Sequence, residues 1–515
     1  MKNEETKTKR LAAKTVFNSS FCLRHSAFVL IALLALAIRL PQLGERPMHT
    51  DESINAYITG ELIAGKSFHY DPQDRHGPAL FVLAEPVAKF LGAKNFSELT
   101  EAQLRLSTVL TGSAMVLLFG AGVEMFGFIP CLIAAILFAF APLPVYYSRY
   151  FIHETLFVAA TFGLILSGWR ALQKNSCSSA ALAGICVALM LACKETAVLH
   201  FFAIAGALFV CRFFFGTPAR TSEILKHAGT MHGIQFWKII STATAVFLFV
   251  FILLFTWFGR NWQALPDLLR AIPHLAARAG GQGHEKLFWY YLVLLGGGWS
   301  GAVILVLAAM GFFCARVSTS RIFPAIYTLL IAAIYGAIPY KTPWLALNLW
   351  LPLALLAGMT VEWFWLATTK LSVRAAILTG LAVLGFLIAH DTRERVFKNP
   401  ADEKNPYAYA HTGEDLPGLP VRLAESARQN KISNPRVAVV AADAWPLPWY
   451  LRKFPQTGFW QPNQDPGDAD FYVTTADAPE KLVARLKKNF RWEFFGARPN
   501  VLLILWTPRP PENSP

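Results

Sequence analysis

The stretch SAFVLIALLALAIRLPQLGERPMHTDESINAYITGELIAG, Ser26 to Gly65, joins a long apolar run to a charged segment that follows it directly. As a helix, residues 26–44 are long enough to cross a hydrocarbon core of about 30 Å. His49, Asp51 and Glu52 therefore stand immediately outside a predicted span. Polar residues in this place either cap the helix that follows or carry out chemistry at the membrane surface.

The composition indicates a membrane protein. Of the 515 residues, 54% are hydrophobic and 16% are charged, whereas soluble domains carry about 25% charged residues. The net charge of +14 does not indicate nucleic acid, because the cations stand between apolar spans, where they orient the chain and attract anionic lipid. The seven cysteines show no zinc spacing, and none falls in the last 200 residues, which argues against a disulfide-bonded outer domain.

The apolar runs predict a polytopic α-helical protein with about eleven transmembrane helices. Residues 1–25 are interpreted as a basic cytosolic tail, and nearly every inner loop then carries Lys or Arg, as the positive-inside rule requires. An odd number of spans places the chain from residue 391 outside the cytoplasm, at the inner or plasma membrane. The predicted spans are 26–44, 105–126, 128–144, 152–170, 178–192, 196–213, 238–258, 288–313, 322–338, 344–366 and 374–390.

Residues 391–515 predict a small extracytoplasmic α/β domain. NPRVAVVAADAWPLPWYLRKF reads as a strand, a turn and a helix, ADFYVTT as a strand, and APEKLVARLKKNF as an amphipathic helix, with strands at RWEFFGA and VLLILWTP. The transmembrane domain, 26–390, has two long outer loops, 45–104 and 259–287. Within the first loop, residues 77–92 are apolar but too short for a span, so we expect an interfacial or re-entrant helix there.

Several cations on the predicted outer face break the positive-inside rule. Arg149, Lys194 and Lys341 are the clearest of them, and an anionic ligand at the outer surface is the simplest explanation. Lys341 also lies between Pro339 and Pro343, which leave irregular backbone at membrane depth, where it is tolerated only if buried in protein or beside a cavity. The alternatives are an interfacial role for Arg149 and a local ion pair for Lys194 with its neighbouring glutamate.

Asp51 and Glu52 have two interpretations. Thr50 or Asp51 is a suitable N-cap for the helix that follows, and acids in a first turn are favoured by the helix dipole. A carboxylate here is equally suited to accept a proton from an attacking hydroxyl. Other polar residues share the predicted outer face and would support such a site: His49, His76, His153, Glu154, Glu195 and Tyr340.

A metal site is a weaker option. The outer-face histidines and carboxylates could hold a divalent cation, but no HxxxH or HExxH spacing is present. No other cofactor is indicated, since Walker loops and nucleophile elbows are absent.

Five motifs occur in the same order as the landmarks of a known superfamily. They are MHTDES (48–53), RHGP (75–78), SRYFIHE (148–154), CKE (193–195) and PYKTPW (339–344). The chain resembles the glycosyltransferase C (GT-C) superfamily over residues 25–365. The nearest groups are the protein O-mannosyltransferases and the lipid A aminoarabinose transferases, and closer still is the family of flippase-activity-associated proteins.

The resemblance implies a GT-C-like fold, a polyprenyl-phosphate-sugar donor, a glycan, lipid or protein acceptor, and inversion at the anomeric carbon. By position, Asp51 matches the catalytic base and Glu52 its acidic neighbour. Arg149 and Glu154 match a polar pair of the second loop, in which the mannosyltransferases have aspartate instead of Glu154. Lys194 and Lys341 match cations near the donor phosphate. A lipid-linked sugar flippase and a non-catalytic partner in envelope glycan assembly remain the alternatives.

Overall fold

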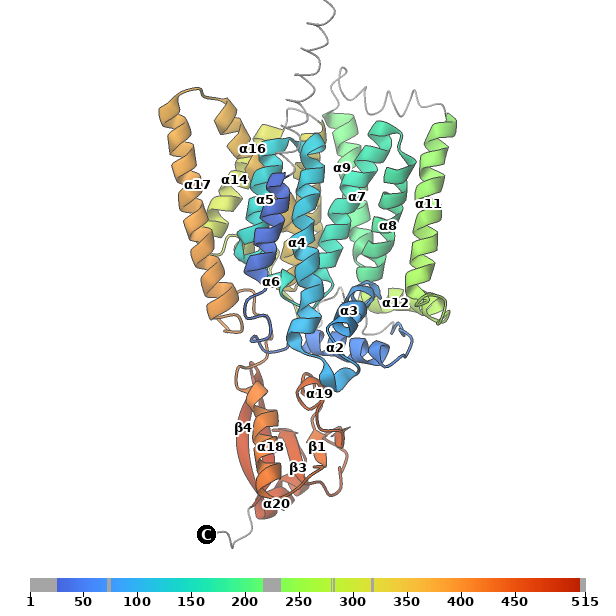
Figure 1. The fold of residues 1–515 in the computed structure, drawn as a ribbon, viewed down its shortest axis with the longest axis vertical. Helices are drawn as coiled ribbons and strands as arrows, with labels where there is room; N and C mark the ends of the chain where they lie inside the picture. Colours follow the sequence, from blue (N-terminus) through green and yellow to red (C-terminus); the bar gives the residue numbers. More distant parts are fainter. Residues whose placement is uncertain are drawn as a thin grey trace, which may run out of the picture.

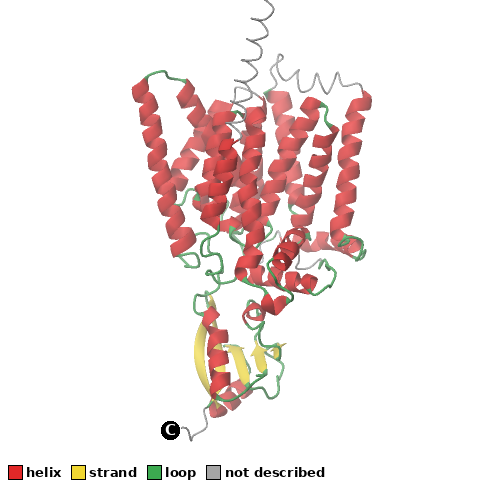
Figure 2. Ribbon diagram, in the orientation of Figure 1, coloured by secondary structure: helices red, strands yellow, loops and turns green. Residues whose placement is uncertain are grey.

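The computed structural model describes residues 26–71, 76–215, 233–278, 280, 283–315 and 319–509. The cytosolic tail predicted for residues 1–25 lies outside this part of the chain. Figure 1 shows long helices standing side by side in one bundle, with a small domain at one end. Figure 2 shows that the strands are confined to this small domain. The predicted combination of a helical membrane domain with a C-terminal α/β domain is confirmed.

Most predicted spans correspond to a long apolar helix. Within the described residues, seven helices are long and apolar enough to cross a membrane, or eight if α5 and α6, which meet at a 59° bend, form one span. Three shorter apolar helices, Ser26–Arg39, α8 and α14, occupy the remaining predicted positions. The bundle helices are α4 (Glu101–Phe126), α5 (Phe128–Phe140), α6 (Pro142–Ser148), α7 (Glu154–Lys174), α8 (Cys177–Cys193), α9 (Ala197–Phe214), α11 (Gly233–Phe255), α14 (Trp299–Cys314), α15 (Thr319–Ala337), α16 (Ala346–Leu366) and α17 (Leu371–Thr392).

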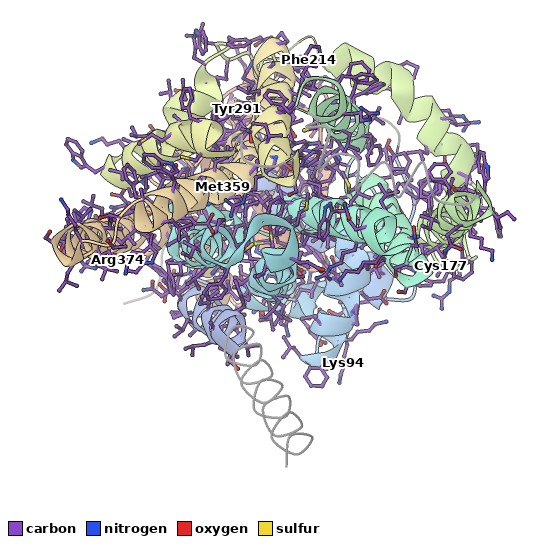
Figure 3. The ribbon with its side chains drawn as sticks, turned by 90° about the horizontal axis from the view of Figure 1, so that it is seen from above. Lys94, Cys177, Phe214, Tyr291, Met359 and Arg374 are labelled. Atoms are coloured by element: carbon purple, nitrogen blue, oxygen red, sulfur yellow. The ribbon has the colours of Figure 1, made fainter. Side chains whose placement is uncertain are left out.

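Helix α16 forms the centre of the bundle. Its span is 94% buried over the most apolar window, whereas the span of α17 is 11% buried. In Figure 3, Met359 of α16 lies near the middle of the bundle and Arg374 of α17 lies at its edge. A helix that is apolar all round suits either a protein core or lipid, so the two helices differ in their neighbours rather than in their hydropathy.

The predicted span 288–313 is broken in two. Helix α13 (Tyr290–Leu295) ends at the glycine run, and α14 begins at Trp299. Gly298 has φ of +88°, which L-residues with a side chain rarely adopt, and a Cβ there would lie 2.6 Å from Nη2 of Arg395. The glycine run therefore interrupts the predicted span, and α14 lies close to the end of α17.

Three helices lie across the end of the bundle that carries the small domain: α2 (Thr50–Ile63), α3 (Ala79–Phe90) and α12 (Ala264–Arg278). The short helix predicted within residues 77–92 is α3. The N-cap of α2 is His49 rather than Thr50 or Asp51, and Glu52 is the N3 residue of its capping box. The side chain of Glu52 thus reaches back to the start of its own helix.

The small domain contains a five-stranded mixed sheet of order β2-β1-β3-β5-β4. β1 pairs in parallel with β2 and β3, and β5 pairs antiparallel with β3 and β4. The strands β1, β3, β4 and β5 and helix α20 stand where the sequence predicts them, whereas β2 and α18 were not predicted. The elements are η5 (Leu416–Gly418), α18 (Leu419–Gln429), β1 (Val437–Val440), α19 (Leu447–Tyr450), β2 (Thr457–Trp460), β3 (Phe471–Thr475), α20 (Glu480–Asn489), β4 (Phe490–Arg498) and β5 (Val501–Pro508).

A linker connects the bundle to the small domain. Helix α17 continues through Thr392 into a π-helical turn, η4 (Arg393–Lys398), so the first residues assigned to the outer domain continue the last bundle helix. Residues 399–412, which we call the linker, then run back along the bundle end. Tyr146 donates a hydrogen bond to the carbonyl of Pro400 at 2.7 Å, and Tyr147 donates one to the carbonyl of Tyr407 at 3.1 Å.

Candidate functional site

Glu52 is a buried structural carboxylate. Its side chain is fully buried, and Arg105 binds both carboxylate oxygens at 2.8 Å through Nε and Nη2. The backbone amide of Phe151 donates to the same carboxylate at 2.9 Å. Burial alone would raise the pKa of Glu52, but the charges of Arg105 and Arg46 outweigh it and hold this pKa well below its usual range. Glu52 is therefore ionised and fully engaged.

The ion-pair cluster of Glu52, Arg105 and Arg46, which we call the Glu52 cluster, joins three separate parts of the chain. Arg105, at the start of α4, also donates to the carbonyls of Leu43 and Arg46. Arg46 donates to the carbonyl of Arg149 at 2.8 Å, and its guanidinium lies 4.6 Å from the ring centre of Tyr150. These charge-assisted bonds fix the start of α2 against α4 and the segment after α6.

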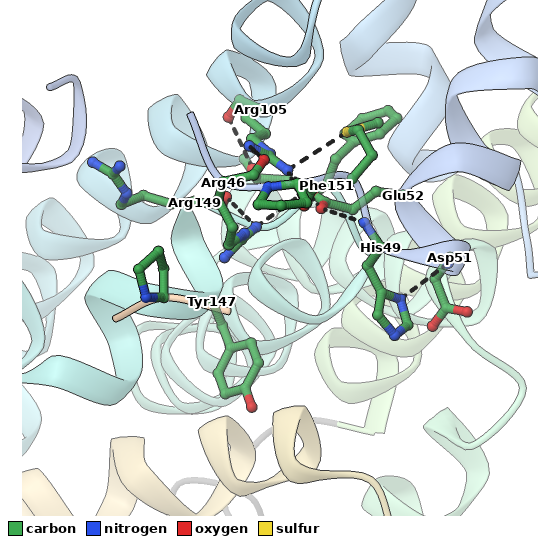
Figure 4. Close-up of polar contacts among 12 residues, drawn as sticks. Arg46, His49, Asp51, Glu52, Arg105, Tyr147, Arg149 and Phe151 are labelled. Carbon is green, nitrogen blue, oxygen red and sulfur yellow. Dashed lines mark hydrogen bonds and ion pairs between the residues drawn. The ribbon is translucent and has the colours of Figure 1, made fainter. Parts of the chain in front are cut away.

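Asp51 differs from Glu52 in having an uncommitted carboxylate. It is partly exposed, and its backbone amide donates a hydrogen bond to Nδ1 of His49 at 3.1 Å. Across the described ranges, its carboxylate has no hydrogen-bond or ion-pair partner. Figure 4 shows Glu52 facing the arginines while Asp51 lies beyond His49 and points away from them. Asp51 is thus the member of the acidic pair that is free to take a proton.

His49 links Asp51 to the linker. Its Nδ1 accepts from Asp51, so Nε2 carries the proton and donates to the carbonyl of Tyr409 at 3.1 Å. Burial lowers the pKa of His49, with partial compensation from the charges of Asp51 and Glu52. The neutral ring packs between Tyr150 and Trp344, at centroid distances of 5.5 and 6.0 Å.

Tyr409 extends this network toward Lys341. Its hydroxyl lies 2.7 Å from Nδ1 of His284, and the backbone amide of Lys341 donates to the carbonyl of His284 at 3.1 Å. A short antiparallel bridge pairs Glu285 with Tyr340, whose ring lies 4.7 Å from that of His284. The segment 283–287 and the PYKTPW motif therefore form one unit beside the linker.

Lys341 is a buried cation with carbonyl partners. Its Nζ donates to the carbonyls of Lys286 and Ile338, and no carboxylate pairs with it in the described chain. Burial lowers the pKa of Lys341. An ammonium has three donors, so one remains for an anion, and such an anion would also relieve the cost of the unpaired buried charge.

Lys194 and Glu195 form a second group, next to α3. Lys194 is in a buried ion pair with Glu154, which favours the local ion-pair interpretation, although its partner is not the adjacent Glu195. Glu195 accepts from Tyr70 at 2.7 Å and lies 3.4 Å from Nδ1 of His76. Burial opposes ionisation of Glu195, but these hydrogen bonds and the His76 charge lower its pKa to about 2.

His153 and Arg149 have structural contacts. His153 lies 3.0 Å, through Nε2, from the carbonyl of Gly77, which ties α7 to α3. Arg149 donates to the carbonyls of Arg39, Pro41 and Gln42. In Figure 4 its guanidinium points away from Asp51. The structure therefore brings His49, Tyr340 and Lys341 into the Asp51 network and leaves Arg149 outside it.

Five residues of this region were not identified from the sequence as site residues. Arg105 lies at the start of a span and looks like a cation at a helix end, and Arg46 was not singled out although it lies in the opening stretch. Tyr409 and His411 lie in the linker, where no motif marks them. The buried ring of His411 stacks on Tyr150 and approaches His49 to 5.6 Å. The fifth, His284, was considered only as a metal ligand.

A metal site finds no support in the geometry. No group of three or more His, Cys, Asp or Glu side chains is arranged to hold an ion in the part of the chain that the structure covers. His49 and His153 direct their ring nitrogens to backbone groups instead. We therefore derive no step through a metal.

The fold is shared with solved membrane glycosyltransferases. The chain has the GT-C fold of polytopic membrane glycosyltransferases. It aligns with ArnT from Cupriavidus metallidurans bound to undecaprenyl phosphate, with a TM-score of 0.63 and 13% sequence identity, over 93% of this chain and 97% of that one. It also aligns with the oligosaccharyltransferase AglB from Archaeoglobus fulgidus in complex with an inhibitory peptide and a dolichol-phosphate. There the TM-score is 0.57 and the identity 12%, over 96% of this chain and 75% of that one.

A sequence match points the same way. Residues 86–257 match the family described as dolichyl-phosphate-mannose-protein mannosyltransferase. No curated protein matched the chain. The family match covers a third of the chain and the fold similarity nearly all of it, and both resemble the GT-C glycosyltransferases to which the ordered motifs are similar.

Proposed function

We propose that this protein is an inverting glycosyltransferase that moves a sugar from a polyprenyl-phosphate donor to an acceptor, with Asp51 as the general base. In this proposal, the end of the bundle that carries α2 and the small domain faces away from the cytoplasm. Support comes from the GT-C fold and from the two similar structures, ArnT bound to undecaprenyl phosphate and AglB in complex with a dolichol-phosphate. Residues that differ between proteins of this shared fold determine which sugar and which acceptor are used.

The contrast between two adjacent carboxylates carries the proposal. Glu52 is committed to Arg105 and to the Phe151 amide, whereas the Asp51 carboxylate is uncommitted. Glu52 fixes the start of α2 and thereby holds Asp51 in place. The carboxylate oxygens of Asp51 are then not needed for hydrogen bonds that stabilise the fold. A general base needs a rigid position together with free lone pairs.

The reaction is a single displacement. Asp51 removes the proton of the acceptor hydroxyl as its oxygen attacks the anomeric carbon, and the bond between that carbon and the phosphate oxygen breaks. The electron pair leaves on polyprenyl phosphate, beside which the Lys341 ammonium neutralises the growing negative charge. Only one base is required, unlike the two-carboxylate retaining scheme.

The test supplies purified protein with polyprenyl-phosphate sugars and an acceptor extract, and measures release of polyprenyl phosphate together with a glycosylated product. Release without any product would indicate hydrolysis. Movement of labelled lipid-linked sugar across liposomes, with no release, would favour the flippase alternative. Absence of both activities under conditions in which the donor binds would favour a non-catalytic assembly partner.

Replacing Lys341 by methionine is expected to weaken donor binding. Hydrogen bonds to charged groups contribute about 1.5–3 kcal/mol, so the apparent donor affinity should fall about 10- to 100-fold, while Lys341→Arg keeps most of it. Lys66→Met is the control, since Lys66 is exposed and pairs with Glu61 on α2. An unchanged donor affinity in Lys341→Met would remove this lysine from the phosphate site.

Replacing His49 by phenylalanine is expected to misplace Asp51. The ring packing against Tyr150 is preserved, but the bonds to Asp51 and Tyr409 are lost. A small displacement at a reacting group can cost up to about 100-fold in rate, so kcat should fall about 10- to 100-fold with little change in donor KM. His49→Asn restores a good N-cap but not the Tyr409 contact, and should recover part of the rate. Equal kcat values in all three proteins would show that His49 only caps α2.

A further inference from the structure

The antiparallel pair β4–β5 presents an exposed aromatic face. Trp492 stands opposite Trp506 and Phe494 opposite Ile504, so these residues share one side of the sheet. Trp492 is 50% exposed and Phe494 is 55% exposed. Leu502, opposite Gly496, continues the face at 48% exposure. We call Trp492, Phe494 and Leu502 the aromatic strip.

The strip exists because the helix on this side covers only part of the sheet. Leu482 and Leu486 of α20 pack on Trp506 and on residues of β1 and β3. β4 is an edge strand, outermost in the order of the sheet, and α20 leaves its residues Trp492 and Phe494 about half exposed. Large exposed side chains on an edge strand favour aggregation unless a partner covers them, so a binding function accounts for the strip better than chance exposure does.

Three cations stand at one end of the strip. Lys487 and Lys488 end α20 immediately before β4 begins, and Arg509 follows β5 directly. Nη2 of Arg509 donates to the carbonyl of Lys487 at 3.2 Å, which brings them together. Within residues 26–509 as described, none of these three pairs with a carboxylate. Favourable placement of lysines at a helix C-terminus explains part of this cluster, but it does not explain Arg509 or the neighbouring tryptophan.

The position of the strip argues against the protein's own membrane as its occupant. Figure 1 places α20 and the beginning of β4 at the end of the molecule that is farthest from the helical bundle. The nearby acid Glu493 belongs to the opposite face of β4, where it accepts from Arg422 at 3.0 Å. The strip therefore combines aromatic rings with three cations that have no carboxylate partner among the described residues, and it begins far from the helical bundle (Figure 1).

We propose that the aromatic strip and the cations Lys487, Lys488 and Arg509 bind an anionic carbohydrate chain. Exposed aromatic faces suit the apolar C–H faces of sugar rings, and Lys and Arg provide donors for carboxylate or phosphate groups. The further inference that this carbohydrate is part of the acceptor rests on the proposed function. The binding itself does not, and it can be measured without turnover.

The experiment uses the full chain in nanodiscs of zwitterionic lipid. Titration calorimetry follows binding of an octamer of α-1,4-linked galacturonate, with uncharged maltooctaose as the comparison. We expect the galacturonate octamer to bind more tightly, and more weakly as salt is raised. Trp492→Ala should reduce the affinity about 10-fold, and Lys487→Gln/Lys488→Gln should reduce both the affinity and its salt dependence.

Two variants serve as matched controls. Phe459→Ala removes an aromatic side chain that is 44% exposed on β2, the other edge strand. Lys481→Gln removes an exposed lysine from the first turn of α20 instead of the last. Both should bind the octamer as the unmodified protein does. Unchanged binding in Trp492→Ala, equal loss in the controls, or no binding at all would overturn the proposal.

The strip has one competing occupant, a second copy of the chain joined edge to edge through β4. Self-association that disappears in Trp492→Ala, without carbohydrate binding, would assign the strip to that contact and overturn the proposal. An experiment can also distinguish failure of the carbohydrate-binding proposal from failure of the proposed function. Transfer of the sugar to a short soluble acceptor, with release of polyprenyl phosphate, should be the same in Trp492→Ala and the unmodified protein, because the strip is far from Asp51 (Figure 1).

Discussion

Replacement of Asp51 by asparagine is expected to lower the release of polyprenyl phosphate by about 10²- to 10⁴-fold, the usual contribution of a general base. The amide has nearly the same shape and keeps the backbone contact of this position with His49. Donor binding should therefore change little, and the loss should appear in kcat. The measurement is single-turnover release of polyprenyl phosphate, with donor affinity determined separately by titration.

Glu45→Gln is the matched control for Asp51→Asn. Glu45 is an exposed acid in the same short segment, six residues earlier, and is not part of the Glu52 cluster. It should turn over at the rate of the unmodified protein. If Asp51→Asn also keeps full turnover, the general base is another group, and the uncommitted carboxylate of Asp51 needs a different explanation.

Replacement of Glu52 by glutamine is expected to damage the fold before it affects the chemistry. The neutral amide cannot balance Arg105, and removal of one partner from a buried ion pair costs about 3–5 kcal/mol. We expect a large fall in thermal unfolding temperature in detergent and loss of monodisperse protein. Glu61→Gln on the same helix should have little effect, since its pair with Lys66 is at the surface, where water screens the two charges.

The depressed pKa of Glu52 gives this prediction a pH dependence. A carboxyl whose pKa is lower in the folded protein stabilises the fold above its ordinary pKa of about 4.3, and this contribution is lost as the pH falls further. The difference in stability between the unmodified protein and Glu52→Gln should therefore shrink as the pH falls below about 4. A constant difference down to pH 3 would mean that packing, and not charge, stabilises the Glu52 cluster.

Much of the fold could be predicted from the sequence. Apolar runs gave the positions of the bundle helices because hydrophobic length is a local property. Strands β1, β3, β4 and β5 followed from short apolar or alternating segments. β2 was missed because TGFW is short and its exposure is intermediate, and α18 was missed because it begins with Leu-Pro after a proline-rich turn. Burial of α16 and exposure of α17 could not be predicted, since both are apolar throughout.

The site was predictable only in part. The motifs identified Asp51 and Glu52 as a pair, but adjacent residues on a helix point about 100° apart, and only the position of Arg105 shows which one is engaged. Arg105 lies 53 residues away and belongs to another helix. Arg149 was predicted as an outer-face cation near the donor phosphate, but the sequence could not show that its guanidinium donates to the carbonyls of Arg39, Pro41 and Gln42. Tyr409 lies 360 residues from His49, so no local pattern could reveal their contact.

The linker has a practical consequence for protein engineering. Its carbonyls accept hydrogen bonds from Tyr146, Tyr147 and His49, and Thr412 donates to the carbonyl of Met48 at 2.6 Å. A chimaera that exchanges the whole C-terminal region after α17 would therefore replace the residues that contact His49 and Met48. A graft joined at Gly413 would replace the sheet domain while keeping these contacts native. This junction is therefore the one at which the sheet domain can be exchanged between relatives without changing the residues around Asp51.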